Sequence, residues 1–245
     1  MENKLRKIHE ETKIEIKPSY KNEEYPKSWI KIYYKNYPRF KKIKLPKPKK
    51  ISKQLYEVIL SRSSIRNFNK KSITIREISE ILYYSCGITN YHNSKSIDET
   101  KRSYPSAGGR YPIEIYLAIF KCEGIKPGIY HYNVKGHYLE LMIPGNHMNK
   151  INGVTYQDMI IKSSITFLLT GVFSRTQVKY GTRAYRYILL DLGHMAQNIY
   201  LVSTNLQIGC CTIGGFSDEK INNFLDLDKS EQVLYMGVLG KYDKN

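Results

Sequence analysis

The chain has 245 residues, of which 41% are hydrophobic, so it is long enough for one packed domain with a terminal arm. Its formal net charge of +17 would suit a nucleic acid, but an anionic cofactor or an acidic peptide explains that charge at least as well. The sequence lacks an apolar run long enough to cross a membrane, the apolar core of a signal peptide, and a metal-ligand spacing among its 4 Cys and 6 His. We therefore expect a cytoplasmic protein with reduced thiols that binds no nucleic acid, membrane or metal.

Residues 1–50 are polar, basic and rich in proline, with 16 Lys and Arg against 6 Glu. Because proline interrupts helices and sheets, we expect no long regular element here. Disordered segments are usually poor in aromatic residues, whereas this one contains Trp29, Tyr33, Tyr34 and Phe40. We therefore predict an extended arm over residues 1–50 that lies on a domain formed by residues 51–245, with a disordered tail as the alternative.

The first half of the predicted domain contains two helices and a strand. Apolar residues recur at helical spacing from Leu55, and a second helix begins at the capping box of Thr74 and Glu77 and ends at Gly87. Residues 88–110 are polar, and we predict an irregular segment there. The apolar run at residues 113–120 predicts a central strand.

The second half begins with a hairpin predicted over residues 128–142. The remaining predicted elements are short helices at 156–163 and 218–225, strands at 165–173, 210–213 and 232–239, and the longest helix at 183–206. Cys210 and Cys211 would point to opposite faces of their strand, which argues against a disulfide between them. Helices and strands do not alternate as a regular βαβ series, so we predict the α+β class.

The first candidate site lies after the first helix, at Arg62, Ser64 and Arg66. An extended segment would place all three side chains on one side, and a helix would place the two arginines on one face. Two guanidinium groups and a hydroxyl suit a phosphate dianion, because Arg binds phosphate with two parallel hydrogen bonds. A solvated basic turn is the structural alternative.

The second candidate site lies before the central strand, at Pro105, Ser106, Ala107 and Gly108, with a further glycine at Gly109. Proline, serine and tandem glycines form a tight loop whose backbone N–H groups stay free. Such a loop can approach a flat ring or a phosphate closely, although an ordinary turn into a strand would have the same composition.

The third candidate site is the pair Lys179 and Tyr180, just before the longest helix. Both side chains can transfer protons once their pKa values are lowered, so the pair is a candidate acid/base unit. Sequence neighbours do not face each other on a helix, so the two address different atoms unless the backbone there is irregular. His194, on the long helix, is more simply explained as a hydrogen-bonded core residue than as a catalyst.

Taken in the order in which they occur along the chain, these motifs resemble those of the flavin-dependent nitroreductases. They resemble in particular the SagB-type branch of that family, whose members are the azoline oxidases of peptide-modifying pathways. The segments that carry the resemblance are R-S-S-I-R-N-F at 62–68, P-S-A-G-G-R-Y-P at 105–112, K-Y-G-T-R-A-Y-R-Y at 179–187, D-L-G-H-M-A-Q-N at 191–198 and I-G-G-F at 213–216.

The resemblance implies a role for each motif. Arg62, Ser64 and Arg66 would grip the phosphate and ribityl chain of FMN, and Lys241 would add a last phosphate contact. The loop of Pro105, Ser106, Ala107 and Gly108 and the turn of Ile213, Gly214 and Gly215 would lie against the flavin. Lys179 and Tyr180 would be catalytic, with Tyr180 as the base and Lys179 lowering its pKa or stabilising an enolate-like charge.

The resemblance also implies an α+β fold with a mixed central sheet flanked by helices, and a homodimer with FMN at the interface. The expected function is that of an FMN-dependent oxidoreductase that converts thiazoline and oxazoline rings in peptides to azoles. Its partners would be a peptide or small-molecule substrate and other enzymes of the modification pathway. Two alternatives share the fold: a stand-alone NAD(P)H-dependent nitro or quinone reductase, which needs no Lys179–Tyr180 pair, and a basic binding module without turnover.

Overall fold

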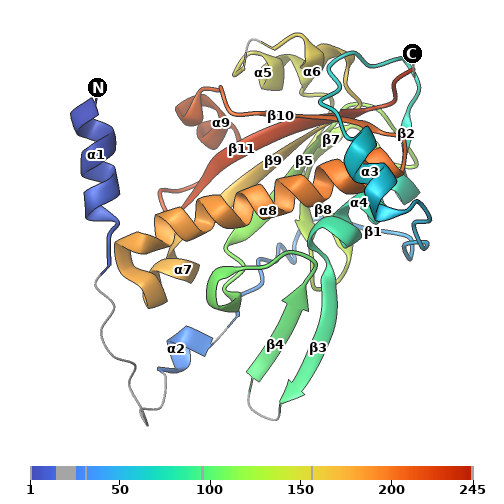
Figure 1. Cartoon of the computed structure of the whole chain (residues 1–245). Coiled ribbons are helices and arrows are strands. Elements are labelled where there is room, and N and C mark those ends of the chain that lie inside the picture. The colour runs from blue at the N-terminus through green and yellow to red at the C-terminus, as the bar shows by residue number, and fades with distance from the viewer. Residues whose placement is uncertain (1, 15–25, 31, 95–96, 156, 244–245) are drawn as a thin grey trace.

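The computed structural model describes residues 2–14, 26–30, 32–94, 97–155 and 157–243. A seven-stranded sheet forms the centre of the molecule, in the order β1-β8-β7-β5-β9-β11-β10 (Figure 1). Its strands are β1 Lys42–Lys44, β5 Ile113–Ile119, β7 Gly128–Asn133, β8 Tyr138–Pro144, β9 Ile165–Val172, β10 Gly209–Ile213 and β11 Glu231–Gly240.

Every neighbouring pair of strands in this sheet is antiparallel, which corrects the expected mixed sheet. In three of these pairs, the second strand follows the first along the chain and lies directly beside it: β5–β7, β7–β8 and β10–β11. A chain that turns back next to the strand it has just formed produces an antiparallel pair. Parallel pairing within the described residues is confined to a small sheet of β2 Ile73–Thr74 and β6 Cys122–Glu123.

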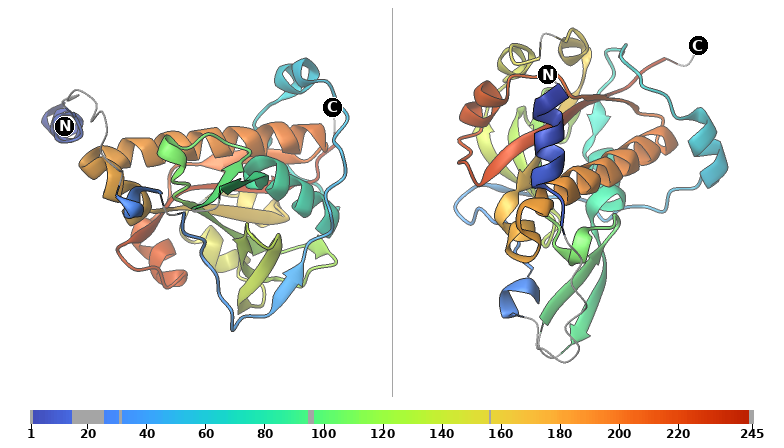
Figure 2. Two further views of the ribbon diagram at one scale, coloured as in Figure 1. Left: turned by 90° about the horizontal axis from the view of Figure 1, so that it is seen from below. Right: turned by 60° about the vertical axis from the view of Figure 1, so that its left-hand side comes forward.

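Helices cover both faces of the sheet, and Figure 2 shows α8 on one side and α9 on the other. The helices of the first face are α4 Ile75–Cys86 and α8 Ala184–Asn205, and those of the second are α5 Met148–Asn152, α6 Met159–Lys162 and α9 Asp218–Phe224. Alternate residues of β5 enter the two cores, with Ile115 and Leu117 toward α8 and Tyr116 and Ala118 on the other side. The predicted α+β class is therefore confirmed.

Several local predictions are also confirmed. The Thr74 side chain accepts from the N–H of Glu77 at 3.3 Å, the Glu77 carboxylate accepts from the N–H of Thr74 at 2.9 Å, and α4 ends at Gly87. Cys210 and Cys211 lie in separate cores, and the four cysteines are free thiols. The helix predicted from Leu55 is α3 Leu55–Ser61. Tyr156, where another predicted helix begins, lies outside the described residues.

The N-terminal segment contains more regular structure than its prolines predicted. Residues 2–11 form the helix α1 Glu2–Glu11, α2 is Lys27–Ile30, and β1 pairs with β8 at one edge of the sheet. Residues between α2 and β1 bind the body: the Lys35 side chain forms an ion pair with Glu231, and the backbone N–H of Tyr37 donates to Glu140 Oε1 at 3.0 Å. Pro18 lies outside the described residues.

Two further segments differ from the predictions. Within residues 88–110, β3 Ile88–Ser94 and β4 Ile97–Arg102 form a hairpin that projects from the body (Figure 1), followed by the short 3-10 turn η1 Ala107–Gly109. Its strands lack the alternation of apolar and polar residues that identifies a half-buried strand. The helix α7 Phe173–Tyr180 follows β9 without a loop, so its start is not marked by turn residues. Within the described residues, no helix has the length and apolarity needed to cross a bilayer.

Candidate active site

The candidate site is built along α8, which has 22 residues. Residues at spacings of three and four, such as Ile188, Leu192 and Met195, are buried against the sheet. Asp191, which is 3% exposed, and Tyr200, which is 9% exposed, are polar residues of the helix that are buried with them. They lie about 14 Å apart along the helix axis, and each organises one group of the site residues predicted from the sequence.

The 105–108 loop is attached to the middle of α8 by Asp191. Ser106 Oγ donates to Asp191 Oδ2 at 2.5 Å, and the N–H of Tyr111 donates to Ser106 Oγ at 2.9 Å. The backbone N–H of Ala107 also donates to the Asp191 carboxylate. Burial outweighs these hydrogen bonds and raises the pKa of Asp191 to about 6. A buried carboxylate therefore fixes the loop.

Lys179 and Tyr180 end α7 and converge on Gly108. The backbone of Tyr180 is not helical, with φ −122° and ψ 6° at the junction with the next turn, η2 Gly181–Arg183. This irregularity brings two neighbouring side chains to one place: a Cβ added to Gly108 would collide with the Tyr180 hydroxyl and lie 3.2 Å from Lys179 Nζ. Gly108 has a φ of 59°, which glycine adopts without strain. The second and third sequence motifs therefore meet.

The surroundings of Tyr180 keep its hydroxyl protonated. Its ring packs edge-on against Tyr187, with ring centroids 4.9 Å apart. Burial is the largest cause that raises the pKa of Tyr180, the neighbouring Tyr187 adds to it, and Arg110 opposes it. This finding corrects the expectation that Lys179 lowers the pKa of Tyr180. At neutral pH the hydroxyl is therefore a hydrogen-bond donor.

Arg62 and Ser64 gather at the other half of α8, around Tyr200. The Arg62 guanidinium lies over the Tyr200 ring, 5.5 Å from its centroid, and Ser64 Oγ is 3.1 Å from the Tyr200 hydroxyl. That hydroxyl also accepts from the N–H of Thr212 at 2.9 Å, which joins the group to β10. Arg66 is exposed. Neither arginine forms an ion pair with a carboxylate in the part of the chain that the structure describes, so both suit an external anion.

The loop that carries these arginines is seated on the ends of β10 and β11. The N–H of Asn69 donates to the carbonyl of Lys241 at 2.8 Å. The Phe68 ring lies against Gly209 and Gly240, where an added Cβ would come within 2.9 Å and 2.6 Å of its carbons. The two glycines therefore admit the ring, and a larger side chain at either position would displace it.

The remaining predicted cofactor residues differ in how accessible they are. Ile213 is buried at the end of β10, whereas Gly214 and Gly215 are exposed, with open space where a Cβ would be. Their backbone is accessible to a flat ring. Lys241 forms an ion pair with Glu77, so its ammonium group is already engaged. A phosphate contact from Lys241 would require that pair to open.

One chain thus presents the predicted residues in two groups rather than one. Ser106, Gly108 and Lys179 line a pocket of about 680 Å³, whereas Ser64 and Arg66 line a separate pocket of about 550 Å³, which Asp243 also lines. A phosphate-bearing flavin fits this set: two arginines that have no carboxylate partner among the described residues, a hydroxyl and an accessible glycine backbone. The described residues contain no group of His, Cys, Asp and Glu that could hold a metal ion.

Sequence reasoning missed the residues that hold these groups in place, Asp191 and Tyr200. The available signal was a polar residue on the buried face of an amphipathic helix, since such residues need a partner. His194, expected in the core, is exposed on α8.

The chain belongs to the nitroreductase family, whose profile matches residues 59–241. It is therefore a nitroreductase-family oxidoreductase. It is 31% identical over 197 residues to the putative nitroreductase MJ1384 of Methanocaldococcus jannaschii, a match that covers 80% of this chain and 94% of that protein. It is also 27% identical over 173 residues to the microcin B17-processing protein McbC of Escherichia coli. That match covers 68% of this chain and 61% of McbC.

Solved structures share the fold at lower identity. A putative nitroreductase from Anabaena variabilis matches with a TM-score of 0.77 and 23% identity, over 98% of this chain and 47% of that one. A chain of the E. coli microcin synthetase McbBCD complex with truncated pro-MccB17 bound matches with a TM-score of 0.63 and 22% identity, over 97% of this chain and 87% of that one.

Proposed function

We propose that this protein is an FMN-dependent dehydrogenase that oxidises azoline rings in peptides to azoles, as SagB-type members of its family do. The observation that carries the proposal is the convergence of Lys179 and Tyr180 on Gly108. It places two proton-transfer groups beside a loop that a flat ring can approach closely. The sequence similarity to a microcin-processing protein supports a peptide as the substrate.

The residues of this chain fit FMN at both of its ends. Arg62 and Arg66 would bind the phosphate with paired hydrogen bonds, and Ser64 would add a hydroxyl. The backbone of two segments would lie along the flavin ring. These segments are the loop of Pro105, Ser106, Ala107 and Gly108 and the turn of Ile213, Gly214 and Gly215. Lys241 would reach the phosphate after leaving Glu77. Bound FMN would supply the hydride acceptor of the reaction.

Lys179 and Tyr180 would provide the proton chemistry. Oxidation of an azoline removes a proton from the ring carbon beside the carbonyl and a hydride from the next ring carbon. Because burial keeps Tyr180 protonated, its hydroxyl can donate to the carbonyl oxygen, which gains negative charge as the proton leaves. Lys179 would accept the proton from that ring carbon in its neutral amine form. These roles reverse the base expected from the sequence.

The proposal includes a homodimer whose FMN sites combine two chains, together with partner enzymes of a modification pathway. In one chain the two groups of site residues lie apart along α8. Apolar side chains on α3 and α8 are strongly exposed, including Leu55 at 65%, Leu60 at 82% and Leu190 at 58%. Exposed apolar surface of this kind often marks an interface. The fold shared with a chain of the McbBCD complex supports an assembly with other enzymes.

The cofactor assignment is tested by replacing both arginines of the first motif. We expect the purified protein to carry FMN and the double variant Arg62→Ala, Arg66→Ala to lose it, because each lost arginine–phosphate pair costs about 1.5–3 kcal/mol. Flavin absorbance per protein after gel filtration measures the effect. The control removes Arg39 and Arg76, which changes the net charge equally. Wild-type FMN affinity in the first variant would show that the assignment is wrong.

The function itself is tested by comparing two reactions of the purified protein. We expect it to oxidise a thiazoline-bearing peptide faster than it reduces a nitro compound with NAD(P)H. Nitro reduction without azoline oxidation would identify the stand-alone reductase instead. A colourless protein that binds peptide without turnover would identify the binding module.

A further inference from the structure

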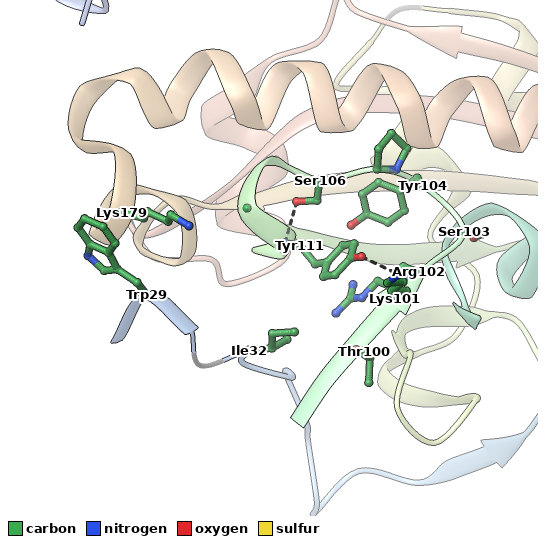
Figure 3. A pocket seen from close by; sticks show the side chains of 13 residues that line it. Trp29, Ile32, Thr100, Lys101, Arg102, Ser103, Tyr104, Ser106, Tyr111 and Lys179 are labelled. Carbon is green, nitrogen blue, oxygen red and sulfur yellow. Dashed lines mark hydrogen bonds between the residues drawn. The ribbon is translucent and has the colours of Figure 1, made fainter. Parts of the chain in front are cut away.

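A pocket of about 680 Å³ lies between the N-terminal segment, the end of β4 and the loop that precedes β5 (Figure 3). Figure 3 shows Arg102, Tyr104 and Tyr111 on one side of this pocket and Trp29 and Lys179 on the other. Of these residues, the proposed proton chemistry uses only Lys179. The pocket therefore adjoins the reaction groups but contains polar residues for which the reaction has no role.

Two of these residues carry buried polar atoms without a partner. Arg102 is 7% exposed and Tyr104 is 1% exposed. The Nε and Nη2 atoms of Arg102 and the hydroxyl of Tyr104 have no hydrogen-bond partner within the described residues. The Arg102 guanidinium stacks on Tyr111, 4.7 Å from the ring centroid, which leaves these N–H groups unsatisfied. Unpaired buried donors are costly, so they indicate an acceptor that comes from a ligand.

The neighbouring carboxylate of Glu114 does not serve as that acceptor. Its Oε1 atom is 2.5 Å from Arg175 Nη2, and its Oε2 atom is 2.9 Å from His131 Nε2. Both oxygens are therefore engaged by other residues. Arg102 retains its charge without a direct ion pair to a described carboxylate.

The charge of the pocket selects an anion. Lys101 and Arg102 line it with positive charge, and none of the described lining residues is Asp or Glu. The planar fork of an arginine matches the two oxygens of a carboxylate. A negatively charged peptide would also be attracted to a chain with a net charge of +17.

The opposite wall is held in place by a buried arginine. Arg110 is 2% exposed, and it donates to the carbonyl oxygen of Trp29 at 2.7 Å and to that of Arg175 at 2.6 Å. Lys179 Nζ lies 5.8 Å from the centroid of the Trp29 ring. An aromatic wall beside the reaction groups suits the backbone and the apolar stems of a peptide.

We infer that this pocket binds a carboxylate group of the peptide substrate, with Arg102 and Tyr104 as its anchors. It would thereby favour peptides that carry an acidic residue near the ring to be oxidised. That the ligand is the substrate rests on the proposed function. The preference for a carboxylate is a property of the pocket and is measurable without turnover.

Trp29 provides the measurement, because the chain contains 1 Trp and this residue lines the pocket. The purified full-length protein is titrated with a C-terminally amidated tetraglutamate peptide, with its tetraglutamine analogue and with inorganic phosphate, while Trp29 fluorescence is recorded. We expect saturable binding of the glutamate peptide and at least about ten-fold weaker binding of the other two, the lower limit for losing a hydrogen bond to a charged group.

Two variants test whether Arg102 and Tyr104 cause the preference for the glutamate peptide. Tyr104→Phe removes only the unpartnered hydroxyl, and Arg102→Lys keeps the charge but removes the fork, so both should bring the two peptide affinities closer together. Lys162→Gln, an exposed residue of α6 on the far face of the sheet, removes one positive charge and should change neither affinity. Circular dichroism confirms that each variant is folded.

Three results would overturn the inference: equal affinity for the two peptides, an unchanged preference in both folded anchor variants, or tighter binding of phosphate than of the glutamate peptide. In the last case, loss of FMN from Arg102→Lys would assign the pocket to the cofactor phosphate. A clear preference for glutamate in a protein that oxidises no azoline would refute the proposed function and retain the carboxylate site.

Discussion

At the scale of single residues, Gly108 is the position on which the proposed acid/base pair depends most directly. Its φ of 59° favours glycine, and an added Cβ would collide with the Tyr180 hydroxyl. The next residue, Gly109, has a φ of 62°, but no atom lies within 4 Å of its added Cβ. The two glycines therefore share a backbone conformation and differ in their contacts.

We expect Gly108→Ala and Gly109→Ala to lose similar stability, about 1–2 kcal/mol each, from the left-handed backbone. Only Gly108→Ala should also displace Tyr180 and Lys179, and its rate of azoline oxidation should fall by at least about 100-fold, the contribution of a general acid or base. Chemical denaturation and steady-state kinetics measure the two effects. Equal losses of rate in both variants would contradict the proposed contact.

The sequence predicted Lys179 and Tyr180 as a pair but not their meeting with Gly108. That contact joins segments far apart in the chain, and it depends on an irregular backbone at Tyr180 that residue pattern does not reveal. Burial in the folded chain raises the pKa of Tyr180, which rules out one of the two roles expected for Lys179, the lowering of that pKa. Stabilisation of an enolate-like charge by Lys179 stays a prediction.

At the scale of elements, α8 orders the site through Asp191, which holds the 105–108 loop. Burial raises the pKa of this carboxyl from its ordinary value of 3.8 to about 6. An acid whose pKa is raised by folding destabilises the folded state once it ionises. The destabilisation is absent below pH 3.8 and complete above about pH 6.

Replacement of Asp191 by Asn should remove this pH dependence, because the amide does not ionise. We expect the free energy of unfolding of Asp191→Asn, relative to wild type, to rise by up to about 3 kcal/mol between pH 4 and pH 8. Urea denaturation at several pH values measures the difference. The same series on Glu219→Gln, an exposed residue of α9, serves as the control. A flat difference for Asp191→Asn would show that its carboxyl is solvated.

Elements with a strong hydrophobic period were predicted close to their observed bounds, as β5, β9, α4 and α8 illustrate. Those missed are polar. The β3–β4 hairpin and α1 are rich in polar residues and lack a strong apolar period, and α7 continues from β9 without turn residues between them. The antiparallel sheet was not predicted because strand direction depends on the path between strands, which local pattern does not determine.

At the scale of the whole molecule, the two groups of site residues indicate how two chains would share a cofactor. In a symmetric dimer, the arginines of one chain can meet the 105–108 loop of the other. The exposed apolar residues of α3 and α8 supply surface for such an interface. This arrangement would make each FMN site depend on both chains.

Subunit mixing tests the shared site. One inactive variant carries Arg62→Ala with Arg66→Ala, and the other carries Lys179→Ala. If sites combine two chains, a mixed dimer regains one intact site, and a fully exchanged equimolar mixture should recover about one quarter of wild-type activity. Sites confined to one chain would recover none. Mass measurement of the mixture verifies that mixed dimers have formed, and a flavin-loaded monomer would remove the basis of the prediction.

We propose that Lys179 and Tyr180 carry out the proton chemistry on the substrate and do not hold the cofactor. The measurement is the ratio of azoline oxidation to flavin reduction by an artificial hydride donor, in Lys179→Ala and Tyr180→Phe. We expect both variants to retain FMN, to lose azoline oxidation by about 10²–10⁴-fold and to retain most of the second rate, because that reaction needs no proton transfer from substrate. An unchanged ratio, whether both rates fall together or neither falls, would show that Lys179 and Tyr180 have a structural role.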